Sequence, residues 1–185
     1  MAKDTYFPLF FSMEDKRILI IGGGQVAERR IGSLLEFGPK MTVVSPGITD
    51  GIRKWVEENL VSWHPDRYQE YRECQEYREC QENREHQEYR DHPLQHENQV
   101  SWRRPDYVLI CTNDTELNHR IAMEWKEKGV PVNNASCKED CDFFFPALIQ
   151  EEGLVFGVSS DGSDHKKVRR ICEKIRSILR ESKEA

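Results

Sequence analysis

The sequence lacks the features of several large classes of protein. No apolar run approaches the roughly 18 residues that a membrane-spanning helix needs. The start of the chain has no basic segment followed by an apolar core, so we expect no secretory signal peptide. A net charge of −6 gives no reason to expect a nucleic acid partner. We therefore expect a soluble protein that binds neither membranes nor nucleic acids.

The six cysteines show none of the spacings that are typical of a secreted disulfide framework. A chain of 185 residues is long enough for one ordinary domain and a small additional element. Because cysteines stay reduced in the cytoplasm, we expect the protein to be located there.

A short apolar strand, residues 17–21, leads directly into three glycines and then into an amphipathic helical pattern. In a dinucleotide-binding loop, the first glycine allows a tight turn, and the next lets the backbone approach a pyrophosphate. A small residue further on lets the helix pack close to the strand. The free N–H groups of the first helical turn point at the phosphates. The residues predicted to bind a cofactor here are Gly22, Gly24, Gln25, Val26 and Ala27.

Strand and helix patterns alternate along most of the chain. The predicted strands are residues 17–21, 41–45, 60–63, 107–111, 130–133, 143–148 and 154–159. The predicted helices are residues 25–37, 48–59, 115–128 and 165–181, the last of which is basic. This alternation predicts an α/β fold with a Rossmann-like parallel sheet and helices on both of its faces.

A repeat interrupts this pattern within residues 67–97. Four near-copies of the hexad Gln-Glu-Tyr-Arg-Glu-Cys run from Gln69 to His92, and each ends in Cys or His. One regular element cannot gather these four side chains around one ion, because hexad ends point about 240° apart on a helix and stand about 20 Å apart along a strand. The repeat also has no continuous apolar stripe that would anchor it to a core. This pattern favours an expanded repeat that is exposed to solvent, and a segment that weakly binds metal ions is the alternative.

Seven segments occur in an order and spacing that are specific together, although each is modest alone. They are Tyr6–Phe11, Gly22–Arg30, Met41–Pro46, Leu109–Asn118, Val132–Ala135, Cys141–Ala147 and Val158–Gly162. With them the chain, over about residues 1–64 and 103–180, resembles the N-terminal part of sirohaem synthases and the free-standing precorrin-2 dehydrogenases.

This resemblance implies an enzyme that oxidises a tetrapyrrole, precorrin-2, to sirohydrochlorin with NAD. Some members also insert ferrous iron. The resemblance further implies a homodimer, joined largely by the part that follows the nucleotide-binding domain. We accordingly predict an NAD-binding Rossmann-like domain over residues 1–142 and a dimerisation segment with the basic helix over residues 143–185.

The end of the second strand bears on the choice between NAD and NADP. Many NAD enzymes have a carboxylate there for the ribose hydroxyls, and an Arg would suggest a 2′-phosphate. Ser45 is neither, so these residues leave the choice open, and only the resemblance implies NAD. Thr112 and Asn113 follow the strand 107–111 at the sheet edge where ligands bind. We add Ser45, Thr112 and Asn113 to the predicted cofactor site, although Asn113 or Asp114 also suits a helix N-cap.

A tetrapyrrole with eight carboxylates needs cations and N–H donors around it. The basic helix offers Lys166 and Arg169, and the loop before it offers Ser159 and Ser160, which match the family's loop rich in serine and threonine. Asn118 matches a family residue in the motif after the strand 107–111. We predict that these side chains bind the substrate.

Position 136 departs from the family pattern. The resemblance implies an Asp there as general base, whereas the hydroxyl of Ser136 cannot accept a proton as a carboxylate does without a partner base. Asp140 and Asp142 are close in sequence, but a small displacement of a base can cost about 10²-fold in rate. Ser136, Asp140 and Asp142 are the predicted catalytic positions, and no metal ligand is predicted.

Two other functions stay open at this point. The neutral residue at position 136 favours a non-catalytic protein that binds NAD or a tetrapyrrole. The Cys/His hexads would instead suit a metal-handling chelatase partner.

Overall fold

The structure, a computed structural model, describes residues 7–69, 71–72, 104–151, 153–160 and 165–181. The hexad repeat beyond Arg72 lies outside these residues. The chain divides into two compact units. One spans Met13–Phe143, and the other combines Met1–Ser12 with Phe144–Ala185. The larger unit carries the glycine loop, and the smaller one carries the basic helix.

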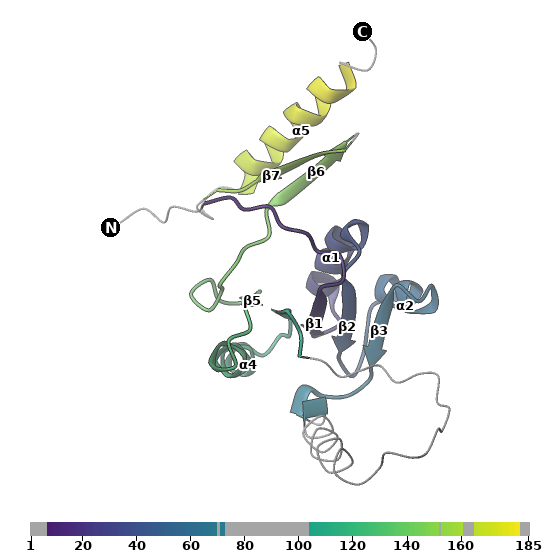
Figure 1. The fold of residues 1–185 in the computed structure, drawn as a ribbon, viewed down its shortest axis with the longest axis vertical. Coiled ribbons are helices and arrows are strands. Elements are labelled where there is room, and N and C mark those ends of the chain that lie inside the picture. The colour runs from purple at the N-terminus through teal and green to yellow at the C-terminus, as the bar shows by residue number, and fades with distance from the viewer. Residues whose placement is uncertain (1–6, 70, 73–103, 152, 161–164, 182–185) are drawn as a thin grey trace, which may run out of the picture. The chain divides into compact units, whose positions relative to one another are not determined.

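The larger unit is built on a five-stranded parallel sheet (Figure 1). Its strands are β1 (Arg17–Ile21), β2 (Lys40–Val44), β3 (Val61–His64), β4 (Tyr107–Ile110) and β5 (Val132–Asn134). Their order is β3-β2-β1-β4-β5, and every neighbouring pair is parallel. The strand order reverses between β1 and β4, and ligands of open α/β sheets bind in the crevice at the carboxyl ends of such strands. The predicted Rossmann-like fold is confirmed.

Helices cover the sheet. They are α1 (Gln25–Leu34), α2 (Asp50–Glu57) and α4 (Thr115–Glu127), and a 3₁₀ turn, η1 (Leu35–Phe37), follows α1. Helices α1 and α2 pack together where the ring of Trp55 lies beside Gly32. Thr49 caps α2, because its hydroxyl accepts a hydrogen bond from the Ile52 N–H at 3.4 Å. These helices place the ends of β1 and β2 next to the start of α1.

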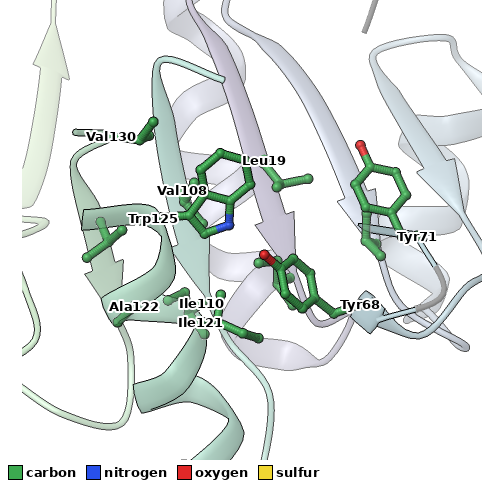
Figure 2. Packing of buried hydrophobic residues seen from close by; sticks show 12 residues of the cluster. Leu19, Tyr68, Tyr71, Val108, Ile110, Ile121, Ala122, Trp125 and Val130 are labelled. Carbon is green, nitrogen blue, oxygen red and sulfur yellow. The ribbon is translucent and has the colours of Figure 1, made fainter. Parts of the chain in front are cut away.

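One apolar cluster fills the space between the sheet and α4 (Figure 2). It includes Leu19 and Val108 from the strands and Trp125 from α4. Tyr68 and Tyr71, which lie in a short helical stretch after β3, belong to the same cluster and are 7% and 5% exposed. The expectation that the repeat has no anchor in a core is therefore wrong for its first hexad.

Tyr68 also takes part in a polar network on α4. The Tyr68 hydroxyl donates to Glu124 Oε2 at 3.1 Å, and Arg72 Nη1 lies 3.4 Å from the same oxygen. Lys128 Nζ contacts Glu124 Oε1 at 2.9 Å. Burial alone would raise the pKa of Glu124, but the hydrogen bonds and positive charges around it lower that pKa below its usual range. The start of the repeat is thus fastened to α4 by both packing and charge.

Two predicted elements differ from the observed ones by more than two residues at an end. The predicted helix 25–37 is an α-helix only to Leu34, since its last residues form η1. The predicted strand 143–148 begins instead at Ala147. The Phe143 carbonyl accepts a hydrogen bond from Asn133 Nδ2 at 2.6 Å, and Pro146 has no N–H to donate to a ladder. The aromatic run before Ala147 is therefore connecting chain.

The smaller unit contains an antiparallel hairpin and a helix. The hairpin joins β6 (Ala147–Glu151) to β7 (Leu154–Val158), and the helix is α5 (His165–Glu181). Gly153 in the turn has φ +80°, a conformation that favours glycine. Ile149 and Cys172 are buried where the hairpin and α5 pack together. Within the described part of the chain, no helix is both long and apolar enough to cross a membrane.

Candidate cofactor and active site

The turn between β1 and α1 requires glycine at its first position. Gly22 has φ +107°, and a Cβ there would lie 2.7 Å from both the carbonyl carbon and the carbonyl oxygen of Cys111. The Gly22 N–H donates to the Val44 carbonyl at 2.9 Å. The turn is therefore held tightly between the ends of β2 and β4. Gly23 is packed as closely against the Gly47 carbonyl, a contact that motif spacing did not reveal.

Gly24 differs from these two glycines because it faces open space. A Cβ on Gly24 would meet no atom within 4 Å, and its backbone is extended, with φ −84° and ψ −172°. It is the N-cap of α1, and no side chain caps that helix among the described residues. Gln25 and Val26 are exposed, whereas Ala27 is fully buried against the sheet. This arrangement fits a pyrophosphate, because the backbone is accessible and the first-turn N–H groups lack a capping side chain.

The end of β2 carries a hydroxyl and no acid. Ser45 Oγ donates to the Gly47 carbonyl at 2.7 Å, and Trp63 Nε1 donates to the Ser45 carbonyl at 2.9 Å. Arg53 lies over the Trp63 ring, 5.7 Å from its centroid. Ser45 thus stands where a ribose binds in related folds, with its hydroxyl turned toward its own loop.

Thr112 and Asn113 lie just beyond β4, at the same sheet edge as the glycine loop. The Thr112 hydroxyl contacts Asn118 Oδ1 and also accepts from the Asp114 N–H at 3.2 Å. Asn113 is exposed. The N-cap of α4 is Asp114, whose Oδ1 accepts from the Leu117 N–H at 2.9 Å. Of the two residues suited to the cap, Asp114 takes that role.

Ser136 is held in a polar cluster at this edge. Its hydroxyl lies 2.8 Å from Asn134 Oδ1 and 3.1 Å from Asn118 Nδ2, so it donates to the first and accepts from the second. Asn118 also donates to the Thr112 carbonyl at 3.0 Å and is fully buried. Burial favours a positioning role for Asn118 over the direct substrate contact predicted from the sequence. The cluster brings Thr112, Asn118 and Ser136 together from three segments of the chain.

The two acids predicted as substitute bases have different surroundings. Asp140 is 4% exposed, and its carboxylate contacts His119 Nδ1 at 3.0 Å and Asn134 Nδ2 at 2.9 Å. Burial would raise the pKa of Asp140, but the hydrogen bonds from His119 and Asn134 lower it below its usual range. His119 was not among the predicted site residues, because its partner lies 21 positions further along the chain.

Asp142 points elsewhere. Its Oδ2 accepts from the Val132 N–H at 2.9 Å, and its Oδ1 lies 3.4 Å from Lys126 Nζ. Both oxygens therefore hold the loop after β5 to the strand and to α4. This engagement favours a structural role for Asp142 over the predicted catalytic one.

The remaining predicted substrate residues belong to the smaller unit. Ser159 Oγ lies 3.3 Å from the Ser160 carbonyl, and both follow β7. Lys166 and Arg169 are exposed on α5, where Arg169 Nε contacts Glu173 Oε1 at 3.0 Å. These four residues thus share one unit: Lys166 and Arg169 lie near the start of α5, and Ser159 and Ser160 follow β7.

An open groove of about 930 Å³ lies at the opposite, amino-terminal edge of the sheet. Its lining includes Tyr71 and Pro105, which lie near the two ends of the stretch outside the described residues. We assign it no ligand. Within the described residues, no group of three or more His, Cys, Asp or Glu side chains is arranged to hold a metal ion.

The parallel sheet, the glycine turn and the open N-terminus of α1 define a Rossmann-like dinucleotide-binding domain. Residues 9–147 match the family described as "Putative NAD(P)-binding". The chain belongs to this family, and the predicted cofactor class is confirmed.

Curated relatives and a solved structure agree with this assignment. The chain is 32% identical over 173 residues to the "Probable multifunctional siroheme biosynthesis protein HemA" of Ruminiclostridium josui, and 28% identical over 173 residues to a "Siroheme synthase" of Psychrobacter cryohalolentis. These matches cover 93% and 94% of the chain, which spans only 28% of the length of either relative. They confirm the predicted resemblance to the N-terminal part of sirohaem synthases.

The solved structure is "SirC, precorrin-2 dehydrogenase", with a TM-score of 0.60 and 21% sequence identity. The match covers 93% of this chain and 70% of that one. At this identity the likeness concerns the fold alone.

Proposed function

We propose that this chain carries out the NAD-dependent oxidation of precorrin-2 to sirohydrochlorin, a step in sirohaem synthesis. The observation that carries the proposal is the pairing of two features at one sheet edge. Gly24 offers open space at the N-terminus of α1, and a polar cluster around Ser136 lies beyond the neighbouring strands. The names of the relatives, siroheme synthases and a precorrin-2 dehydrogenase, supply the substrate class.

Bound NAD would supply the acceptor for the hydride that leaves the macrocycle. The chain's part is to bind and orient. The turn from Gly22 to Ala27 would hold the pyrophosphate through backbone N–H groups, and Ser45 at the end of β2 would lie beside the adenosine ribose. Thr112 and Asn113 would border the nicotinamide end, where Asn118 fixes Thr112 and Ser136 in place.

NAD is the proposed form of the cofactor, in preference to NADP. Ser45 at the end of β2 is neither an acid for the ribose hydroxyls nor a cation for a 2′-phosphate, so the preference for NAD rests on the resemblance to an NAD-linked family. Calorimetric titration with each nucleotide tests this choice. We expect clear binding of NAD and at least tenfold weaker binding of NADP, and the reverse order would contradict the proposal.

The substrate's carboxylates would meet the basic start of α5. Lys166 and Arg169 are exposed cations there, and charged hydrogen bonds to carboxylates are among the stronger ones. The hydroxyls of Ser159 and Ser160 would add neutral donors. Charge reversal at Lys166, Lys166→Glu, should raise the KM for precorrin-2 without changing NAD affinity, whereas an unchanged KM would argue against this placement.

We also propose a homodimer formed through the smaller unit. Several large apolar side chains of this unit are exposed, among them Phe10 at 69%, Leu154 at 54% and Ile178 at 64%. Apolar groups of this size on one small unit are typical of an interface. Light scattering at micromolar concentration should give twice the chain mass, and Ile178→Lys should shift the mass toward that of one chain. A wild-type mass of one chain would contradict the dimer.

A second candidate function is that of a non-catalytic binder of NAD or a tetrapyrrole. The neutral hydroxyl of Ser136 at the position of the family's acid favours it. Anaerobic incubation with precorrin-2 and NAD separates the two functions. We expect the sirohydrochlorin spectrum to develop only when NAD is present. Binding of NAD without product at any enzyme concentration would support the binder.

A further inference from the structure

A His–Asp pair is linked to Ser136 through the side chain of Asn134. His119 Nδ1 lies 3.0 Å from each oxygen of the Asp140 carboxylate. Since a carboxylate at neutral pH only accepts hydrogen bonds, Nδ1 must carry the hydrogen, which leaves Nε2 of a neutral imidazole as an acceptor. The His119 side chain is 58% exposed, whereas that of Asp140 is 6% exposed. His119 thus exposes an imidazole with Nε2 as the acceptor, and the buried carboxylate of Asp140 fixes the ring through Nδ1.

The same loop links this pair to the position of the missing family base. Asn134 donates through Nδ2 to Asp140 and accepts through Oδ1 from Ser136. One asparagine side chain therefore separates Ser136 from the carboxylate that holds His119. Neither of the two predicted acids is itself suited to accept a proton, because Asp140 is buried with two partners and Asp142 is tied to Val132 and Lys126.

We propose that His119 accepts the proton released in the oxidation, with Asp140 as the residue that positions its imidazole. This proposal rests on the proposed dehydrogenase function. The arrangement follows the logic by which a buried carboxylate fixes the tautomer and direction of a catalytic histidine. Position 136 holds no acid, and His119 would supply the base in its place. The spacing of residues in the sequence does not reveal this base.

The step balances in atoms and electrons. The macrocycle loses two hydrogens. One leaves with the electron pair of its C–H bond as hydride to the oxidised nicotinamide, and the other leaves as a proton to His119 Nε2. The resulting imidazolium keeps its contact with the Asp140 carboxylate and returns its proton to water after product release. The chain needs no further oxidant or cofactor for this role.

Other charged residues lie close to the pair in sequence. The loop that packs on α4 carries Lys138, Glu139 and Asp142, of which Asp142 pairs with Lys126. On α4 itself, Glu116 and Arg120 are one turn or less from His119 and are exposed. Asp140 is the residue that forms an ion pair with the imidazole in the described part of the chain.

A structural tether is the competing role for this pair, and His119→Gln separates the two. A glutamine amide can still donate to Asp140 but cannot act as a base at neutral pH. Arg120→Gln, one residue further along the exposed face of α4, is the matched control. For each protein we would measure kcat and its pH profile, NAD affinity by calorimetry, and the melting temperature.

We expect His119→Gln to lower kcat by about 10²–10⁴-fold, with NAD affinity and melting temperature unchanged and with the acid limb of the pH profile lost. Added imidazole should restore part of the rate in His119→Ala. In ¹⁵N spectra, wild-type His119 should carry its hydrogen on Nδ1, and Asp140→Asn should weaken that preference.

Three results would overturn the proposal. Turnover of His119→Gln at the wild-type rate would remove the base role while leaving the dehydrogenase function intact. An equal loss in Arg120→Gln would show that the effect is not specific. NAD binding without product in the wild type would contradict the proposed function, and the role of His119 would fall with it.

Discussion

Gly22 and Gly24 lie two residues apart in one turn, yet their substitution should have opposite consequences. A side chain at Gly22 would meet the Cys111 carbonyl at 2.7 Å in a backbone with φ +107°. A side chain at Gly24 would meet no protein atom within 4 Å, in an extended backbone that valine also adopts. Gly22→Ala should therefore damage the fold, whereas Gly24→Val should damage only the cofactor site.

The magnitudes follow from these contacts. Strain at a left-handed position costs about 1–3 kcal/mol and an overpacked contact a similar amount, so Gly22→Ala should lower the free energy of unfolding by roughly 2–6 kcal/mol. Gly24→Val loses only a favourable N-cap residue, at about 1 kcal/mol or less. Its methyl groups would keep the pyrophosphate from the first-turn N–H groups. Loss of two charge-assisted hydrogen bonds, at about 1.5 kcal/mol each, corresponds to about 100-fold weaker NAD binding.

Urea unfolding and NAD calorimetry on the same samples test this pair. The matched control is Gly32→Ala on α1, where a Cβ would lie 3.4 Å from the Trp55 ring, an ordinary contact. The control should keep NAD affinity and gain slight stability, because alanine favours a helix over glycine. Wild-type NAD affinity in Gly24→Val would refute the assignment of this loop as the pyrophosphate site.

Three further predictions concern the anchor and the polar cluster. Tyr71→Ala should lower the free energy of unfolding in urea by about 3–5 kcal/mol. Deletion of residues 69–92, which removes Tyr71, should lower it by a similar amount, whereas deletion of residues 75–92 should not. Equal stability of the two deletion variants would contradict the anchoring role of Tyr71. Because the pKa of Asp140 is lowered on folding, ionised Asp140 stabilises the folded protein. This contribution is complete above the ordinary pKa of about 3.9 and is lost as the pH falls through the pKa of the folded state. The melting temperature of Asp140→Asn should therefore fall less steeply with decreasing pH than that of the wild type. Ser136→Asp would place a carboxylate against Asn134 Oδ1, so we expect a lower melting temperature and no gain in kcat, and a large gain would show that position 136 needs an acid.

The parallel sheet was predictable because its signals are local. Apolar runs such as residues 17–21, turns with glycine, and apolar residues at helical spacing each lie within a short window of sequence. The run 143–148 shows the limit of this approach, because its aromatic residues suit a strand. Its pairing was decided by the Asn133 side chain, ten residues away, and by the missing N–H of Pro146.

The parts of the site that the sequence did not reveal depend on tertiary contacts. Gly23 lies against Gly47, and His119 meets Asp140, in each case across more than twenty positions of the chain. The burial of Tyr71 was not predicted for another reason. Its hexad is hydrophilic as a whole, so the pattern of the repeat gave no sign that the fold buries this one tyrosine.

The most direct test of the proposed function is the stoichiometry of its reaction. Under anaerobic conditions, purified protein, precorrin-2 and NAD would be mixed, and the absorbance of reduced cofactor and of sirohydrochlorin would be recorded together. We expect both products to appear at equal rates in a one-to-one ratio, and we expect Gly24→Val to slow the formation of both by the same factor when NAD is not saturating. Binding of NAD with neither product formed, or sirohydrochlorin formed without reduced cofactor, would contradict it.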